Sequence, residues 1–440
     1  MTNKPYAKIG AVVCVVIGAS WLGTTWYGGQ KIMKQYPEAL AKINSSQFGA
    51  MKFVITKQEA GFFTSHVNWD LIITPNPCSP NFTFKISGYD VIRNGLFPSL
   101  GFGQVQSHIV WPEQVKPFFS KMFGKAEPLQ IKTNIGVLGG LTTKISSPVA
   151  TYKDQNGELN WKGLSGSISY DETRSDADID LAGIHLTNGQ KQFVIQLDKI
   201  SYESNLKQGA SGLGLGESEL SMSGLNVDGA GKNFGFKKLE INTKASEKDG
   251  FFAVNLNSKV EQLIQNGKTV GQFNMSSSVE HIDAKALKNA TDLVKKARLE
   301  CKPSYEAAIK AAQPIFEKGV NATLKNADLE LFEGKAHAEG KANLPSLSAA
   351  EVQDIKQGLL KLEIDGKANI TEKLISAIAK SMLEKSANGQ PVDPQLQAQV
   401  VGQMLEKPLS EGLIIKAADG YTSSFQVRQG KTTVNGKPLN

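Results

Sequence analysis

Alternation between apolar and polar positions dominates the chain from about residue 48 to its end. Residues 239–244 alternate in this way, and residues 251–256 repeat the alternation after the pair Asp249-Gly250. A period of two residues is typical of a β-strand with one buried face. The pattern therefore predicts antiparallel strands with one apolar face and one face rich in Ser, Asn, Lys and Asp.

Tight-turn dipeptides separate the predicted strands. Asn-Gly and Asp-Gly pairs supply the positive φ that two-residue hairpin turns require. They stand at Asn94-Gly95, Asn156-Gly157, Asn188-Gly189, Asn266-Gly267, Asn388-Gly389, Asn435-Gly436, Asp228-Gly229, Asp249-Gly250, Asp365-Gly366 and Asp419-Gly420. Many short strands joined at this spacing predict an antiparallel meander.

Helical periodicity interrupts the strands in a few places. A short stretch at 31–44 is followed much later by segments near 283–319, 371–386 and 393–407, each with apolar residues on one side. The apolar face of a sheet must be covered, so we expect these amphipathic helices to pack on it. The expected fold class is mainly β with accessory helices (α+β), built on one large curved antiparallel β-sheet meander.

The start of the chain contains a long uncharged segment. No charged residue occurs from Ile9 to Gln30, and Lys4 and Lys8 precede it. About 20 helical residues span the roughly 30 Å hydrocarbon core of a bilayer. The segment therefore predicts a transmembrane helix with its N-terminus in the cytoplasm and aromatic residues at the far interface. The anchor residues are Ile9, Val12, Val15, Ile17, Trp21, Leu22, Trp26 and Tyr27.

Two other interpretations of this segment fit its sequence less well. A cleaved signal peptide requires a small-x-small site, and only residues 18–20 resemble one, inside the apolar run and before a Trp. A buried helix of a soluble protein does not fit a run this long and uniform. The expected organisation is a cytoplasmic tail at 1–8, an anchor at 9–27 and a β-rich domain at 28–440 across the membrane.

The composition is that of a folded protein, with 40% hydrophobic and 21% charged residues in 440. Three cysteines exclude a disulfide scaffold and a cysteine-rich zinc module. Cys14 lies in the predicted anchor. Cys78 and Cys301 either form one disulfide in an oxidising compartment or remain two unpaired thiols, and the sequence leaves both alternatives open.

The net charge of +7 does not indicate nucleic-acid binding. Only four arginines occur, whereas recognition of phosphate and guanine relies on the bidentate arginine side chain. The lysines are scattered among carboxylates. This charge predicts a solvated surface with a weak preference for anionic lipid head groups.

No motif predicts a catalytic, cofactor or metal site. The five histidines have no second ligand at helical or turn spacing. The carboxylates at 176, 178 and 180 imitate a calcium loop, but Leu181 and Thr187 stand where glycine and glutamate are required. Gly267-Lys268-Thr269 lacks the earlier glycine of a phosphate-binding loop. We therefore expect no enzyme activity and no cofactor.

Residues 26–32 form an aromatic-Gly-basic motif after the uncharged segment, and residues 421–439 form a predicted closing hairpin. Both are similar to motifs of the YdgA-like family of bacterial inner-membrane proteins. The chain departs from the family at two positions. These are Ala60, which precedes Gly61, and Asn94, which precedes Gly95. The matching structural positions are Gly61, Phe63, Ser65, Gly95, Phe97, Pro98, Asn435 and Gly436.

The resemblance implies a single-pass inner-membrane protein whose bulk lies in the periplasm, and it brings no catalytic residues. A looser similarity to AsmA-type envelope proteins concerns architecture only. We expect a non-enzymatic cell-envelope protein that binds membrane lipid or acyl chains in an apolar β groove. The alternative is an assembly protein that acts as a homo-oligomer or with an envelope partner. An envelope hydrolase would need convergent carboxylates, for example Glu59 near Asp90.

Overall fold

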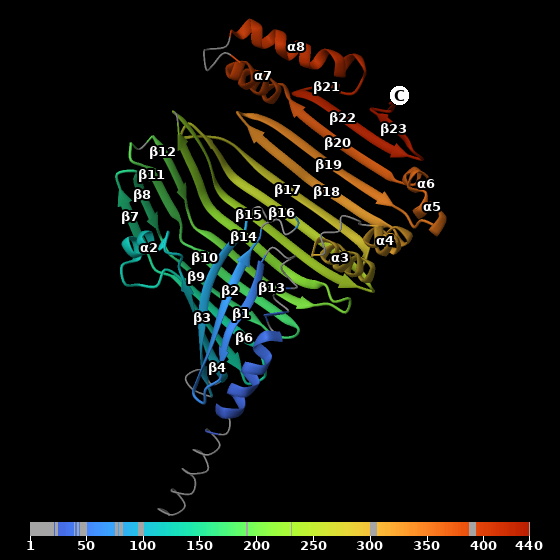
Figure 1. The fold of residues 1–440 in the computed structure, drawn as a ribbon. Helices are drawn as coiled ribbons and strands as arrows, with labels where there is room; N and C mark the ends of the chain where they lie inside the picture. The colour runs from blue at the N-terminus through green and yellow to red at the C-terminus, as the bar shows by residue number, and fades with distance from the viewer. Residues whose placement is uncertain are drawn as a thin grey trace, which may run out of the picture. The chain divides into compact units, whose positions relative to one another are not determined.

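A computed structural model describes most of the chain. The described residues are 22, 25–38, 40–41, 44, 51–74, 78, 82–95, 101–190, 192–229, 231–299, 306–386 and 393–439. They confirm a mainly β fold with a large antiparallel sheet and accessory helices (Figure 1). The chain divides into two compact units: unit 1 takes residues from 1–152, 160–182 and 292–305, and unit 2 takes residues from 153–159, 183–291 and 306–440.

Unit 1 is built on an antiparallel sheet in which most neighbours in sequence are neighbours in space. The strands follow the order β1 (Met51–Glu59), β2 (Thr64–Ile73), β3 (Phe84–Asn94), β4 (Gly101–Val110), β5 (Gln130–Gly136), β6 (Leu141–Ser147), β9 (Leu164–Tyr170) and β10 (Arg174–Leu181). Helix α2 (Lys116–Phe123) follows β4. The division between the units falls within β7 (Ala150–Asp154) and β8 (Gly157–Trp161).

Unit 2 contains the longest strands. Their order is β11 (Ile184–Asn188), β12 (Phe193–Leu197), β14 (Gly214–Gly229), β15 (Lys232–Lys248), β16 (Phe251–Gln265), β17 (Lys268–Asp283), β18 (Val320–Leu331), β19 (Gly334–Leu344), β20 (Glu363–Thr371), β22 (Gly420–Arg428), β23 (Lys431–Val434) and β24 (Lys437–Pro438). Strand β13 (Ile200–Gln208) also pairs with β14, and β21 (Ile415–Ala417) with β22.

The helices occupy the connections between these strands. They are α3 (Ala284–Leu299), α4 (Glu306–Lys318), α5 (Ala349–Gln353), α6 (Ile355–Leu360), α7 (Glu372–Ser386) and α8 (Pro394–Ser410). The buried carboxylate of Asp283 accepts a hydrogen bond of 2.7 Å from the backbone N–H of Ala286, so it satisfies a free donor in the first turn of α3. The side chain of Asp393 caps α8 in the same way through Gln395.

A helix that includes residues 25–38 packs on the sheet of unit 1. Ile32 and Met33, each 6% exposed, join Val67, Ile92 and Val105 in one buried apolar cluster. The buried residues of β2 (65, 67 and 69) are two apart, and those of the helix (25, 28, 29, 32 and 33) follow the helical spacing of three and four, so each element contributes its own periodicity to the same core. This helix covers the apolar side of β2, β3 and β4.

The described residues contain no helix with the length and hydropathy needed to cross a membrane. Among the predicted anchor residues, Leu22, Trp26 and Tyr27 are described, and all three are exposed. The others lie outside the described residues: Ile9, Val12, Val15, Ile17 and Trp21. The transmembrane anchor therefore stays a prediction.

A buried carboxylate ties the helix to the sheet. Asp90 on β3 is 4% exposed, and it accepts hydrogen bonds from the Tyr36 hydroxyl and from Nε1 of Trp69 at 2.9 Å. Burial, the negative charge of Asp90 and this hydrogen bond together raise the pKa of Tyr36 far above its ordinary value. Tyr36 therefore remains a hydrogen-bond donor under all physiological conditions.

We expect Tyr36→Phe to lower the free energy of unfolding by about 1–3 kcal/mol, because Asp90 then keeps a buried oxygen without its donor. The wild type should also lose stability as the pH rises above about 10, where the unfolded phenol ionises and the folded one does not. The variant should lose that part of the pH dependence. Urea unfolding from pH 7 to 11 measures both effects.

Tyr89→Phe is the matched control. Tyr89 neighbours Asp90 on β3, but its side chain is 39% exposed. Its substitution should change the unfolding free energy by less than about 0.5 kcal/mol. Equal losses for the two variants would contradict the importance of the buried contact.

Cys78 is disulfide-bonded, and its partner falls outside the described residues. The Sγ of Cys78 lies 3.5 Å from the carbonyl oxygen of Arg298, near the end of α3. Cys301 follows Arg298 by three positions, whereas Cys14 belongs to the distant uncharged segment. We therefore expect the disulfide to join Cys78 to Cys301.

Alkylation of the unfolded, unreduced protein should modify one thiol, and alkylation after reduction should modify three, as counted by intact mass. Cys301→Ser should free Cys78 for alkylation, whereas Cys14→Ser should not. Closing a loop of this length is worth about 5 kcal/mol in the chain-entropy model. Recovery of three free thiols without reductant would refute the pairing.

Candidate functional site

Seven strands of unit 2, β15 to β20 and β22, lie side by side (Figure 1), and their paired residues form one continuous apolar surface. Residues opposite one another in antiparallel strands lie on the same face. One such row starts at Ile241 and crosses Met275 and Ala338 before it ends at Ser423. Three parallel rows flank it at two-residue steps.

We call these four rows the apolar face. Its members are Leu239, Ile241, Thr243, Ala245, Val254, Leu256, Ser258, Val260, Phe273, Met275, Ser277, Val279, Ala322, Leu324, Ala327, Leu329, Ala336, Ala338, Gly340, Ala342, Ile364, Gly366, Ala368, Ile370, Tyr421, Ser423, Phe425 and Val427. None of these described residues carries a charge.

The opposite side of the same strands is polar. One row on this side starts at Lys244 on β15 and continues through Asn255, Ser278 and Thr323 to Lys341 on β19. Polar and charged side chains interact on this side. For example, Nδ1 of His337 lies 2.6 Å from Oδ1 of Asp328. The hydrogen bond from His337 lowers the pKa of Asp328. The two sides of the sheet therefore differ sharply in polarity.

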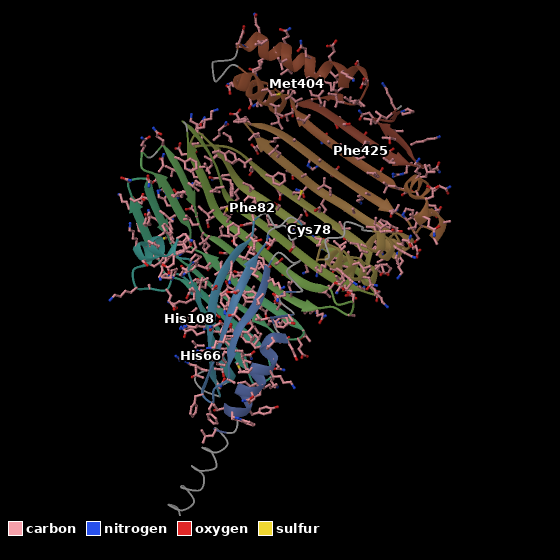
Figure 2. All side chains as sticks on the ribbon, in the orientation of Figure 1. His66, Cys78, Phe82, His108, Met404 and Phe425 are labelled. Atoms are coloured by element: carbon pink, nitrogen blue, oxygen red, sulfur yellow. The ribbon has the colours of Figure 1, made fainter. Side chains whose placement is uncertain are left out.

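Most residues of the apolar face are half-buried and not fully covered by other parts of the described chain. Of its residues only Tyr421 is buried, and Phe425, labelled in Figure 2, is 41% exposed. Six interstrand steps of about 4.8 Å make the face about 29 Å wide, and three two-residue steps make it about 20 Å long. Monomeric proteins rarely expose a contiguous apolar surface of several hundred Å², so this face is the candidate interaction surface of the described residues.

Helix α7 covers one end of the apolar face. It begins directly after β20, and its residues Leu374, Ile375 and Ala379 are buried. A Cβ on Gly334 of β19 would lie 2.3 Å from the backbone nitrogen of Leu374, so this close approach requires glycine. The predicted cover by amphipathic helices is present at this end, and the absence of a linker after β20 keeps α7 there.

The described residues contain no cluster that could hold a metal ion. Glu59 forms an ion pair with Lys57, which lowers the pKa of Glu59, whereas Asp90 is buried against Trp69. The convergent carboxylates that a hydrolase would require are thus not formed by this pair.

A cleft of about 450 Å³ lies on the polar side of the sheet. The ring of His281 stacks on that of Phe251 in the wall of this cleft.

The motif residues near the start of unit 1 gather at one point. The side-chain nitrogen of Asn94 donates to the carbonyl oxygens of Gly61 and Phe62 at 3.0 and 3.1 Å, and it lies 3.3 Å from the hydroxyl of Ser65. Gly95 donates its backbone N–H to Phe102. Phe97 and Pro98 lie outside the described residues.

The C-terminal motif closes the last hairpin of unit 2. Asn435 and Gly436 both have positive φ and join β23 to β24. The side chain of Asn435 accepts a hydrogen bond of 2.8 Å from the backbone of Ser424 and donates one of 2.9 Å to Gly412. The structure thus gives Asn435 and Gly436 an architectural position in the last hairpin.

Sequence reasoning did not single out the most prominent part of the apolar face. On β19, Ala336, Ala338 and Ala342 alternate with lysine, histidine, glutamate and asparagine. Alanine is a weak hydrophobic signal, so this alternation is fainter than that of 239–256. Counting alanine and glycine as apolar positions would have revealed it.

Comparison with known proteins gives two matches. The model of the family described as "Bacterial protein of unknown function (DUF945)" matches residues 3–440. "Protein YdgA" of Escherichia coli (strain K12) is 23% identical over 319 residues, which are 64% of this chain and 61% of that protein. No solved structure matches the chain. Because the family model matches nearly the whole chain, the protein belongs to the DUF945 family of bacterial proteins of unknown function.

Proposed function

We propose that this protein is a non-enzymatic cell-envelope protein, anchored in the inner membrane by residues 9–27, that binds lipid acyl chains on the apolar face in the periplasm. The single observation that carries the proposal is the apolar face, in which seven paired strands offer uncharged side chains to one side and only Tyr421 is buried. The uncharged N-terminal segment and the disulfide of Cys78 support the proposed cellular location.

The proposed location agrees with two features of the chain. The uncharged segment from Ile9 to Gln30 has the length of a membrane span. Cys78 is disulfide-bonded, and structural disulfides persist in oxidising compartments such as the periplasm. Both features favour a body held outside the cytoplasm beside a lipid surface.

The size of the apolar face suits acyl chains. A bilayer of two leaflets has a hydrocarbon core of about 30 Å, so one chain extends over about 15 Å. A face of about 29 by 20 Å accommodates such a chain along or across the strands. Covering about ten methylene groups would gain about 8 kcal/mol, the free energy of micromolar affinity before the entropic costs of binding.

A second copy of the chain is the competing occupant. Two such faces pressed together would bury about 1,200 Å², the lower end of the range for stable interfaces. The alternating small residues Ala338, Gly340 and Ala342 give no interlocking side chains for such a contact. A fluid hydrocarbon chain adapts to a smooth surface, so we favour lipid.

The proposal is tested by a substitution at the centre of the face. Ala338→Lys should reduce the phospholipid that co-purifies with the full chain by at least about tenfold, since a lysine within hydrocarbon costs about 2.5–3.5 kcal/mol and recovers part of this by extending to water. Its melting temperature should change little, because Ala338 is only half-buried. Lipid mass spectrometry and thermal unfolding measure the two effects.

Glu339→Lys is the matched control, since Glu339 is the next residue of β19 and lies on the polar side. It should leave lipid recovery unchanged. Equal loss in both variants, or no lipid above background in the wild type, would refute the proposal. A wild-type dimer that Ala338→Lys converts to a monomer, without bound lipid, would establish the second copy as the occupant.

A further inference from the structure

The turn between β1 and β2 presents two aromatic side chains to solvent. Phe62 is 43% exposed and Phe63 is 52% exposed, and their rings meet edge to face with centroids 4.7 Å apart. Exposed phenylalanines in the hairpin of a folded unit cost free energy in water. Two of them side by side indicate a surface that something apolar covers.

The turn is held in place by Asn94 of β3. The side-chain nitrogen of Asn94 donates to the carbonyl oxygens of Gly61 and Phe62, and its backbone N–H donates to that of Phe63 at 2.9 Å. Asn94 is itself 6% exposed. Three hydrogen bonds from one buried residue fix the turn, so the two rings extend outward from a rigid support.

The same residue contacts the first helix. A Cβ on Gly29 would lie 2.5 Å from the side-chain nitrogen of Asn94, so the helix backbone rests directly on this amide. The neighbouring residues Trp26 and Tyr27 are 54% and 56% exposed. Asn94 therefore brings two exposed aromatic pairs to one end of unit 1. We call Leu22, Trp26, Tyr27, Phe62 and Phe63 the aromatic patch.

The composition around the aromatic patch matches a bilayer surface. The chain contains no Asp or Glu from Met1 to Pro37, whereas Lys31 and Lys34 follow the patch on the helix. The Nζ of Lys31 lies 5.0 Å from the ring centroid of Phe102. Aromatic rings favour the interface between hydrocarbon and water, and lysines favour anionic head groups. The uncharged residues 9–21 lead directly into Leu22.

We propose that the aromatic patch inserts into the head-group region of the membrane, with Phe62 and Phe63 forming a second contact beside the anchor. This inference rests on the membrane tether of the proposed function. A single helix allows a body to swivel, whereas a second contact from the β1–β2 turn fixes the orientation of unit 1. Strands β2 and β3 then extend away from the bilayer.

The opposite end of the same strands supplies a control position. Figure 2 shows His66 at the helix end of unit 1, with Cys78 and Phe82 at the other end. Phe84 begins β3 opposite Ile73, and it is 59% exposed. From the turn to this point β2 rises about 31 Å, more than the depth of the head-group region.

The experiment places the photoreactive residue benzoylphenylalanine at position 62, 63 or 84 of the full chain in vesicles of phosphatidylethanolamine and phosphatidylglycerol. Each site is an exposed phenylalanine, and unchanged thermal unfolding verifies the fold. Irradiation should yield lipid adducts at positions 62 and 63, and few or none at position 84. Equal lipid adducts at all three sites, none at positions 62 and 63, or adducts only to protein there would overturn the proposal.

A fourth probe separates this inference from the proposed function. Benzoylphenylalanine in place of Phe425 reports lipid on the apolar face. Lipid adducts at position 425 without any at positions 62 and 63 would refute the second contact and retain acyl binding. Adducts at positions 62 and 63 without any at position 425 would support the contact and oppose acyl binding on the face.

Discussion

A β-sheet with one apolar side must hide that side from water, and this constraint shapes both units of the molecule. In unit 1 the side chains of Ile32 and Met33 cover the apolar side of the sheet, because the first helix lies on β2, β3 and β4. The buried carboxylate of Asp90 then fixes the depth and angle of the helix through Tyr36 and Trp69. Without that helix the apolar positions of three strands would face solvent.

Unit 2 meets the same constraint only in part. Helix α7 covers one end of the sheet at Gly334 and Tyr421, and the remaining rows stay accessible. Unit 1 gains free energy when its own helix buries the apolar strand positions. In unit 2 an external apolar molecule would gain free energy by covering the accessible rows. This difference explains how one chain with one strand pattern can contain a closed packing unit and an open apolar surface.

Tight-turn pairs such as Asp249-Gly250 stand where hairpins occur, as between β15 and β16, whereas the turn predicted at Asp365-Gly366 was wrong, because both residues pair on both sides within β20. On β19 alanine alternates with polar and charged residues. Because alanine is a weak hydrophobic signal, the sequence did not indicate the centre of the apolar face. The cluster around Asn94 joins Gly29 and Gly61 over long sequence distances, and no local periodicity encodes such contacts. Similarly, the hydrogen bond from Tyr36 to Asp90 depends on the angle at which the helix meets the sheet.

The division of the chain has a consequence for the order of synthesis. Unit 1 contains residues from 292–305 although the long strands β14 to β17 of unit 2 precede them. The carbonyl oxygen of Arg298 lies beside Cys78, so the first unit acquires its last segment only after strands β11 to β17 of the second have been synthesised. Maturation of the two units is therefore interleaved, and an early stop in translation would leave both incomplete.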